Sequence, residues 1–418
     1  MADITEVLND IRAHASLDYQ RAIPAAVNEN LEEIADAVMS SIQLQNDYVA
    51  ALVNRISATR FTSRMFQNPY QKFIRGTNRF GDTIDEIYVN MANAHEYNPS
   101  IAENEVYKRE IPDINAVFHR RNSKVFYKNT IQYDALYASF LSDNGMRSLI
   151  GRIVDAMYGA ANRDIFYCTK KLMNVYSPYY YKVTVPAATA ANADQIVTTI
   201  KGISNMLEFP SDLYNRFGVE NFTEKPRQVL ILRADVAAVL DVNSLAKAFN
   251  LQYADFIAGT YVTVDTFGDG LDNMLGLLVD DEFFQIYTNL EKFTENYNGQ
   301  GLYWQYFLHR WMTYSVSPFS NAIAFVTGEL TEPMAIMIDP AAPNVPQGGN
   351  QQFTATVTPS TAQQSVHWEI NGQKNGGTYI TATGLLHIDS EESATSITVT
   401  AKCPSAQTIT KTATVTVS

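Results

Sequence analysis

Acidic side chains gather in one segment of the chain in a way that could serve cation binding. In DTFGDGLDN (Asp265–Asn273), the carboxylates of Asp265, Asp269 and Asp272 surround two glycines. A calcium loop of the EF-hand type needs oxygen ligands at alternating positions and a closing glutamate, and this segment does not meet that spacing. We therefore interpret it as a turn rather than as a metal site.

A second acidic group, Asp280–Asp281–Glu282, precedes an expected strand. We interpret this run as a solvated turn. The chain contains no GxGxxG, P-loop, GxSxG or CxxC motif, and its histidines do not have the spacing of metal ligands: His14, His95, His119, His309, His367 and His387. We predict no catalytic residue, no metal, no cofactor and no enzymatic activity.

The composition narrows the class of protein. A chain of 418 residues, 46% of them hydrophobic, is expected to form two or three domains with real cores. The net charge of −13 argues against general binding to nucleic acid or anionic membranes.

Cys168 and Cys403 lie in regions of different character, so we expect no disulfide, as in a reducing cytosol. The first thirty residues do not resemble a signal peptide, and Trp311–Gly328 predicts two buried strands and a turn instead of a membrane helix.

The element most clearly predicted is one long helix over Asn144–Tyr176. Apolar residues recur there at steps of three and four, which places them on one face of a helix: Met146, Ile150, Ile153, Met157, Ala161, Ile165, Cys168, Leu172 and Val175. Charged residues, Lys170 among them, fall largely outside this stripe and are expected to face water. Pro178 should end the helix. At 1.5 Å per residue the helix would be about 45–50 Å long and would serve as a strut.

The segments before this helix differ in texture. Residues up to about Ser57 predict short amphipathic helices, for example Asn30–Met39 and Gln45–Ile56. Their expected buried positions are Leu31, Ile34, Val38, Val49, Leu52 and Ile56.

Residues 60–119 then predict an extended excursion that includes the strand Thr83–Val89. A solvated loop is the alternative, but so long and weakly apolar a loop is unusual within a compact domain. We expect it to lie across a neighbouring molecule, where exposed charge pairs worth only about 0–1 kcal/mol each would set the register. The candidate intersubunit contacts are Arg60, Arg64, Arg75, Arg79, Asp85, Glu86, Arg120 and Arg121.

After the long helix, short strands and helices alternate, which predicts an α+β region. Aromatic strands follow over Phe293–Gly328. At Thr331–Glu332–Pro333 the composition shifts to Thr, Ser, Val and Gln, and short alternating strands predict a small β-sandwich with Trp368 in its core, facing Phe353 and Val399.

Several long blocks resemble the major capsid proteins of phi29-like phages: DTIDEIYVNMANAHEYN, REIPDINAVFHRRNSKVFYKNTIQYDAL, LDVNSLAKAFN and GLYWQYFLHRWMTYSVSPFSNAIAFVTGEL. The resemblance implies the Hong Kong 97-type capsid fold over residues 1–332. Its expected parts are an N-terminal arm (1–59), an extended loop (60–119), a peripheral domain with the spine helix (120–176 and 290–332) and an axial domain (177–289). Residues 333–418, with QGGNQQFTATVTP, VHWEI and ATGLLHI, are similar to bacterial Ig-like group 2 domains.

The resemblance implies a structural protein that self-assembles, as pentamers and hexamers, into the icosahedral shell of a tailed phage. Scaffolding and portal proteins are the implied partners. The shell would enclose double-stranded DNA without sequence-specific binding and without a membrane. Assembly would take place in the cytoplasm of a bacterial host. A surface adhesin is the alternative, because Ig-like domains are common in adhesins. Against it, the chain carries one Ig-like domain rather than a tandem series, and no signal peptide is expected.

Overall fold

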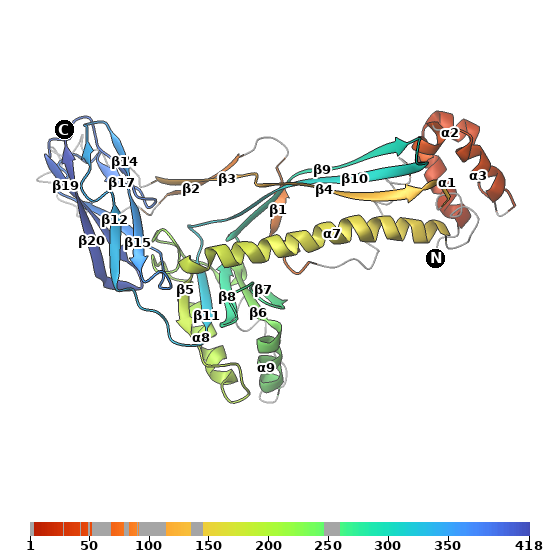
Figure 1. Cartoon of the computed structure of the whole chain (residues 1–418). Helices are drawn as coiled ribbons and strands as arrows, with labels where there is room; N and C mark the ends of the chain where they lie inside the picture. Colours follow the sequence, from red (N-terminus) through yellow and green to blue (C-terminus); the bar gives the residue numbers. More distant parts are fainter. Residues whose placement is uncertain are drawn as a thin grey trace, which may run out of the picture.

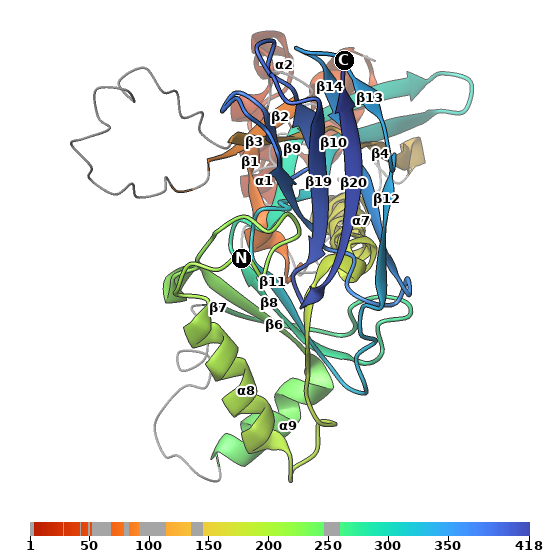
Figure 2. The same cartoon turned by 90° about the vertical axis from the view of Figure 1, so that its left-hand side faces the viewer.

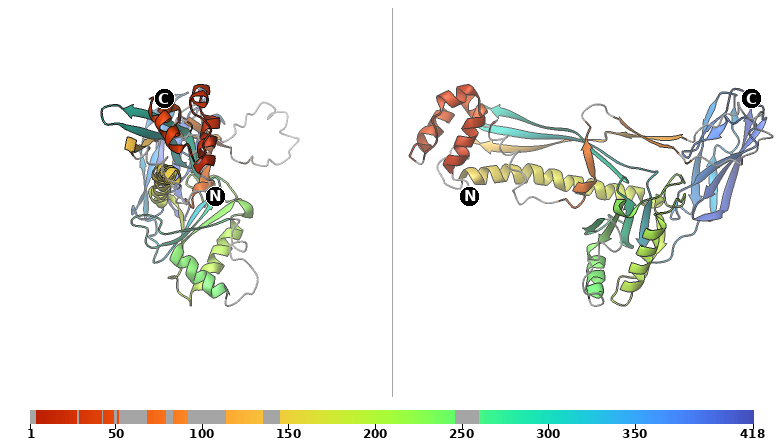
Figure 3. Two further views of the ribbon diagram at one scale, coloured as in Figure 1. Left: turned by 90° about the vertical axis from the view of Figure 1, so that its right-hand side faces the viewer. Right: turned by 180° about the vertical axis from the view of Figure 1, so that it is seen from behind.

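The protein is elongated, with a helical arm at one end and a β-sandwich at the other (Figures 1 and 3). This computed structural model describes residues 4–27, 29–41, 43–48, 51, 68–78, 83–89, 91, 114–134, 145–245 and 260–418. The arm contains α1 (Ile4–His14), α2 (Leu17–Ala22) and α3 (Leu31–Met39), followed by helical residues 43–48. Ile34 and Val38 are buried as predicted, whereas Val49, Leu52 and Ile56 lie outside the described residues.

Helix α7 (Gly145–Tyr176, 32 residues) confirms the predicted strut. Its buried residues include Met157, Ala161 and Ile165. The prediction was wrong for Val175, which is 66% exposed, because Met173 and Tyr176 occupy the buried side of the last turn. The helix passes into the short 3-10 turn η2 (Ser177–Tyr179), which contains Pro178.

Beside α7 lies a four-stranded sheet in the order β1-β9-β10-β4 (Figure 1). The antiparallel pair β9 (Phe284–Asn298) and β10 (Tyr303–Val316) forms its centre, and β4 (Ser123–Gln132) and β1 (Ile74–Thr77) form its edges. The sequence predicts one strand over Phe283–Tyr287 and aromatic strands from Phe293 onward, whereas a single longer strand covers Phe284–Asn298. Trp304, Tyr306 and Leu308 of β10 are buried against the arm helices and the first half of α7.

A second sheet has the order β5-β11-β8-β6-β7. Its strands are β5 (Tyr181–Thr184), β11 (Ala322–Val326), β8 (Met274–Asp280), β6 (Gln228–Arg233) and β7 (Thr260–Val264). Alternate residues of β6 pack on opposite faces: Val229 and Ile231 join the core under α7, while Leu230 and Leu232 join the core with α8 (Ala193–Met206) and α9 (Ala234–Leu245). Figure 2 shows α8 and α9 together on the side away from α7. Because both faces are covered, all seven residues of β8 are buried.

Two further strands, β2 (Thr83–Val89) and β3 (Ile114–Arg120), form an antiparallel ribbon that we call the ribbon. Strand β3 leads almost directly into β4, and the ribbon extends from there toward the sandwich (Figures 1 and 3). Strand β2 has the bounds that the sequence predicts.

The C-terminal sandwich, here called the tail, contains strands β12 to β20 in sheets ordered β13-β20-β19-β16, β14-β18-β17 and β12-β15. Trp368 is buried and its ring lies 6.1 Å from that of Phe353, as predicted, in a core that includes Val399. The strands are β12 (Ala335–Asp339), β13 (Asn344–Val345), β14 (Asn350–Gln352), β15 (Thr354–Thr358), β16 (His367–Asn371), β17 (Tyr379–Ile380), β18 (Leu385–His387), β19 (Ser396–Cys403) and β20 (Ala406–Val417).

Both cysteines are free thiols, and Cys403 is buried in the tail. The sequence also predicts a short helix over Ala135–Leu141, and these residues lie outside the described part of the chain. Among the helices that the structure describes, none is both long and apolar enough to cross a membrane.

Candidate functional site

The residues predicted to contact neighbouring subunits fall into three groups. Asp85 and Arg120 are exposed on the same face of the ribbon. Arg75, Glu86 and Arg121 make contacts within the chain: Arg75 pairs with Glu282, Glu86 with His119, and the Arg121 guanidinium lies 4.8 Å from the Trp311 ring. Arg60, Arg64 and Arg79 lie outside the described residues.

Glu86 fastens the inner face of the ribbon to the body of the molecule. One of its carboxylate oxygens accepts a hydrogen bond from Ser317 Oγ at 2.5 Å, and the other lies 2.8 Å from His119 Nε2. The second ring nitrogen of His119, Nδ1, lies 2.7 Å from Ser315 Oγ. His119 comes from β3 and the serines follow or end β10, so this chain of contacts joins both ribbon strands to the central sheet.

Tyr88 makes the next inward contact along β2. Its ring stacks on Phe319 with centroids 5.5 Å apart, and its hydroxyl donates to the carbonyl of Glu220. Partial burial, with the nearby Glu220 carboxylate, raises the pKa of the Tyr88 hydroxyl, which therefore stays protonated and able to donate at neutral pH. The ribbon thus rests on two loops, one before β6 and one between β10 and β11.

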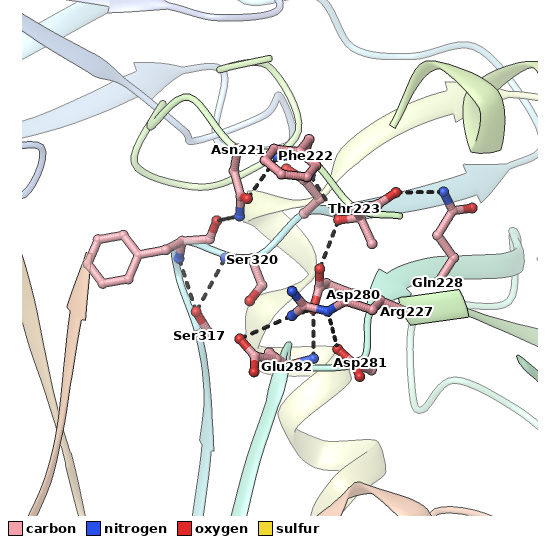
Figure 4. Close-up of polar contacts among 12 residues, drawn as sticks. Asn221, Phe222, Thr223, Arg227, Gln228, Asp280, Asp281, Glu282, Ser317 and Ser320 are labelled. Carbon is pink, nitrogen blue, oxygen red and sulfur yellow. Dashed lines mark hydrogen bonds and ion pairs between the residues drawn. The ribbon is translucent and has the colours of Figure 1, made fainter. Parts of the chain in front are cut away.

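The same two loops meet the end of β8 at the buried carboxylate of Asp280 (Figure 4). Asp280 accepts hydrogen bonds from Thr223 Oγ1 at 2.9 Å, Arg227 at 3.0 Å and the backbone N–H of Glu282 at 2.8 Å. Asn321 Nδ2 donates to Thr223 Oγ1 at 3.1 Å and extends the network to the β10–β11 loop. The prediction of a solvated turn was wrong for Asp280, because two segments distant in sequence close over it.

Asp281 and Glu282, beside Asp280, are exposed as predicted, and both also pair with the Arg227 guanidinium. The Arg227 guanidinium reaches Asp281 at 3.1 Å and Glu282 at 3.1 Å, and Arg75 of β1 approaches Glu282 at 3.5 Å. Burial raises the pKa of Asp280 to about 6, while its hydrogen bonds and the Arg227 charge oppose that shift. These contacts tie the two sheets together at one point.

The Asp280 carboxylate is covered by its own hydrogen-bond donors, the Thr223 hydroxyl and the Arg227 guanidinium among them (Figure 4). Over the described part of the chain, no group of three or more His, Cys, Asp or Glu is placed to hold a metal ion.

The loop that loosely resembles a calcium site is a turn, as predicted, and its first carboxylate has a protein cation as partner. Lys170 Nζ of α7 donates to both oxygens of Asp265, at 2.9 and 3.0 Å, and to Thr266 Oγ1 at 2.8 Å. Lys170 is only 9% exposed, so the expectation that it faces water was wrong. The partner lies far away in sequence, and no local pattern signals the pair.

A cleft of about 500 Å³ separates the tail from the second sheet. The chain linking the body to the tail forms one wall through Glu329 and Glu332, and Tyr181 and Lys182 of β5 form another. Partial burial lowers the pKa of Lys182.

Sequence reasoning missed the apolar character of the outer ribbon face. Ile87, Val89, Ile114 and Phe118 point away from the body and are 50–64% exposed. Isolated exposed apolar residues are ordinary, but cross-strand pairing places these four on one face. Within both TIDEIYV and INAVFHR, every second residue lies on the same strand face, and pairing the two segments could have revealed this apolar face.

Comparisons with known proteins agree with this architecture. The family model of Phi29-like phage major capsid proteins matches residues 8–326, and that of bacterial Ig-like domains of group 2 matches residues 334–416. The major capsid protein of Bacillus phage PZA is 34% identical over 395 residues, covering 93% of this chain and 87% of that protein. The major capsid protein of Bacillus phage B103 is 32% identical over the same shares of the two chains.

Among solved structures, the fold is similar to a chain in the capsid structure of Staphylococcus phage Andhra. The TM-score is 0.52 at 11% identity, over 63% of this chain and 85% of that one. A chain in the structure of the head fiber and inner core protein gp22 of bacteriophage P68 has a TM-score of 0.50 at 12% identity, over 64% and 86% of the two chains. At such identities, this likeness concerns the fold alone.

Proposed function

The chain belongs to the family of Phi29-like phage major capsid proteins and is a major capsid protein of a tailed phage; we propose that it assembles, as pentamers and hexamers, into an icosahedral shell around double-stranded DNA. The observation that carries this conclusion is the 34% identity to the capsid protein of Bacillus phage PZA over 93% of the chain. The function is mechanical, in keeping with a junction of covered polar groups and with the absence of a metal cluster among the described residues.

The outer ribbon face is our candidate for contact between subunits. Its four exposed apolar side chains bury surface when a neighbour covers them, at about 25 cal/mol per Å². Asp85 and Arg120 stand on the same face and would fix the register rather than the affinity, because exposed ion pairs contribute only about 0–1 kcal/mol. Many such contacts around each subunit act together in a closed shell.

We further propose a division of labour along the chain that follows the Hong Kong 97-type arrangement. The arm and the extended loop would reach neighbouring subunits, the axial part with α8 and α9 would point to capsomer centres, and the tail would sit on the outer face of the shell. The parts are the arm (1–59), the extended loop (60–119), the peripheral domain (120–176 and 290–332), the axial domain (177–289) and the tail (333–418).

Partners follow from this assignment. Scaffolding and portal proteins would guide assembly in the cytoplasm of the bacterial host. The net charge of −13 suits a wall that encloses DNA without binding it tightly, since tight phosphate binding needs a basic surface.

Electron microscopy of the expressed chain tests the proposal, beside its size-exclusion profile and with or without added phage lysate. We expect shells, tubes, sheets or five- and six-fold rings from the wild type. A double variant, Ile87→Asp with Phe118→Asp, should remain folded but unassembled, because it places two carboxylates in the apolar contact. Met337→Asp, at an equally exposed residue on β12 of the tail, is the matched control and should assemble.

Two outcomes would count against these proposals. If the ribbon variant assembled at wild-type efficiency, the proposal of a shell would stand, but the outer ribbon face would not be a contact between subunits. A wild-type chain that stays monomeric in lysate and instead binds bacterial cells would favour a surface adhesin.

A further inference from the structure

Two residues of β3 are buried although most of the strand around them is exposed, and one of them, Asn115, has its partner outside the body. Asn115 of β3 is only 1% exposed, and its side-chain oxygen accepts a hydrogen bond from the backbone N–H of Ala382 at 2.8 Å. Ala382 belongs to the tail, so a segment more than two hundred residues later covers the ribbon near its far end, where Asn115 pairs with Tyr88. Figures 1 and 3 show that end of the ribbon directed at the tail.

The tail presents this N–H from a turn that its own core holds in shape. The Gly384 N–H donates to Thr381 O at 2.9 Å and closes the turn, and the Thr381 hydroxyl accepts from Leu385 N at 3.0 Å. Gly384 has a φ of +82°, and a Cβ there would meet Phe353 O at 2.7 Å and the Trp368 ring at 3.0 Å. The donor is therefore preorganised by contact with the central tryptophan of the tail.

A second set of contacts fixes the tail to the body just beyond the end of α7. Gln364 N donates to Pro178 O at 3.0 Å, and Ser365 Oγ donates to Tyr179 O at 3.2 Å. Nearby, His367 Nδ1 lies 3.7 Å from Asp212, and its ring packs beside Gly218. The tail is thus anchored at one place and touches the ribbon at another.

We propose that the tail braces the ribbon of its own chain. The contacts form a closed circuit: the tail rests on η2, the ribbon rests on the body through Glu86 and Tyr88, and Asn115 joins ribbon to tail. A two-stranded ribbon is marginally stable on its own, and support on two sides limits how far it can swing. The tail therefore holds the ribbon at a set angle before any neighbouring subunit arrives, and this inference does not depend on what the outer ribbon face contacts.

Hydrogen–deuterium exchange of the full-length, unassembled subunit, read by mass spectrometry, tests the brace from both sides. Asn115→Ala removes the acceptor. Ala382→Pro removes the donor at the second position of the Thr381–Gly384 turn, where proline is well tolerated and should leave the tail folded. In either variant we expect amides of residues 83–89 and 114–120 to exchange about two- to tenfold faster, the range expected for one hydrogen bond. The double variant should equal Asn115→Ala alone, because Ala382→Pro removes a bond that Asn115→Ala has already broken.

Two controls separate this effect from general loosening. Asp85→Ala, on the exposed face of the ribbon, should leave ribbon exchange unchanged. Peptides from β19 should exchange at the wild-type rate in every variant, which reports that the tail remains folded. Unchanged ribbon exchange in Asn115→Ala and Ala382→Pro would overturn the brace, and additive effects in the double variant would show that the two residues act independently.

Discussion

Lys170 is a charged residue whose place in the fold depends on one distant partner. It lies buried in the side of α7, with its ammonium 5.0 Å from the Phe166 ring centroid and bound to both oxygens of Asp265. The Asp265 carboxylate is by contrast 62% exposed. Partial burial would raise the pKa of Asp265, but the hydrogen bond and charge of Lys170 outweigh it and lower that pKa. The buried ammonium of Lys170 therefore needs its partner more than the exposed carboxylate of Asp265 does.

This asymmetry predicts unequal costs when either partner is removed. Asp265→Ala leaves a buried ammonium without its counter-charge and should lower the free energy of unfolding by about 2–4 kcal/mol. Lys170→Met keeps the volume and leaves behind an aspartate that water can solvate, so it should cost less than about 1.5 kcal/mol. Urea unfolding followed by far-UV circular dichroism compares the two variants. Equal costs, or a larger one for Lys170→Met, would show that Lys170 remains solvated.

Glu392 of the tail is a carboxylate enclosed by four hydrogen-bond donors. It accepts from the backbone N–H groups of Lys374, Asn375 and Ala394 and from Thr378 Oγ1, at 2.7–3.2 Å. Burial alone would raise its pKa, but these hydrogen bonds to the charged form prevail and lower the pKa to about 2.

Because the folded pKa of Glu392 lies below its usual value of 4.5, the tail should gain stability from this residue above that pH. The contribution, about 1–3 kcal/mol, should be lost as the pH falls from about 4.5 to about 2. Glu392→Gln removes the titration. The difference in unfolding midpoint between wild type and variant should therefore shrink across that window. A difference that is constant with pH would mean that the glutamate is not held ionised by its donors.

At the scale of elements, local sequence patterns predicted where helices and strands form better than they predicted which other segments pack against them. The period of Asn144–Tyr176 predicted α7, and TIDEIYV predicted β2, because both patterns are written in consecutive residues. The burial of Val175 and Lys170 was predicted wrongly, because the segments that pack against α7 change along its length. Tyr176 turns instead into an aromatic cluster, where its ring centroid lies 5.1 Å from that of Phe283.

The long hairpin and the junction show a second limit of sequence reasoning. The outer half of β9, EKFTENYN, has little apolar content and continues as a strand because β10 pairs with it residue by residue. Asp280 became a buried junction because Thr223 and Asn321 close over it, and neither residue is near it in sequence. Such contacts depend on tertiary pairing, which periodicity does not encode.

On the scale of the whole molecule, the cores of body and tail are separate. Among the described residues, the buried apolar side chains of the tail form one cluster with members only between Ile336 and Val417, centred on Trp368. The clusters of the body contain residues between Leu8 and Leu330. Hydrogen bonds join tail and body, such as those of Gln364 and Ser365 with η2. Polar contacts of this kind add only about 0.5–1.5 kcal/mol each.

Separate cores predict that residues 333–418 fold without the rest of the chain. Because the fragment keeps its whole apolar cluster, it should unfold in one cooperative transition in urea, followed by the fluorescence of Trp368, its single tryptophan. The full-length chain should show this transition at nearly the same midpoint, beside a separate one for the body. A fragment without a cooperative transition would mean that the tail needs the body to fold. If residues 1–332 instead failed to fold alone, the tail would be part of the body's core and not an appended domain that braces the ribbon.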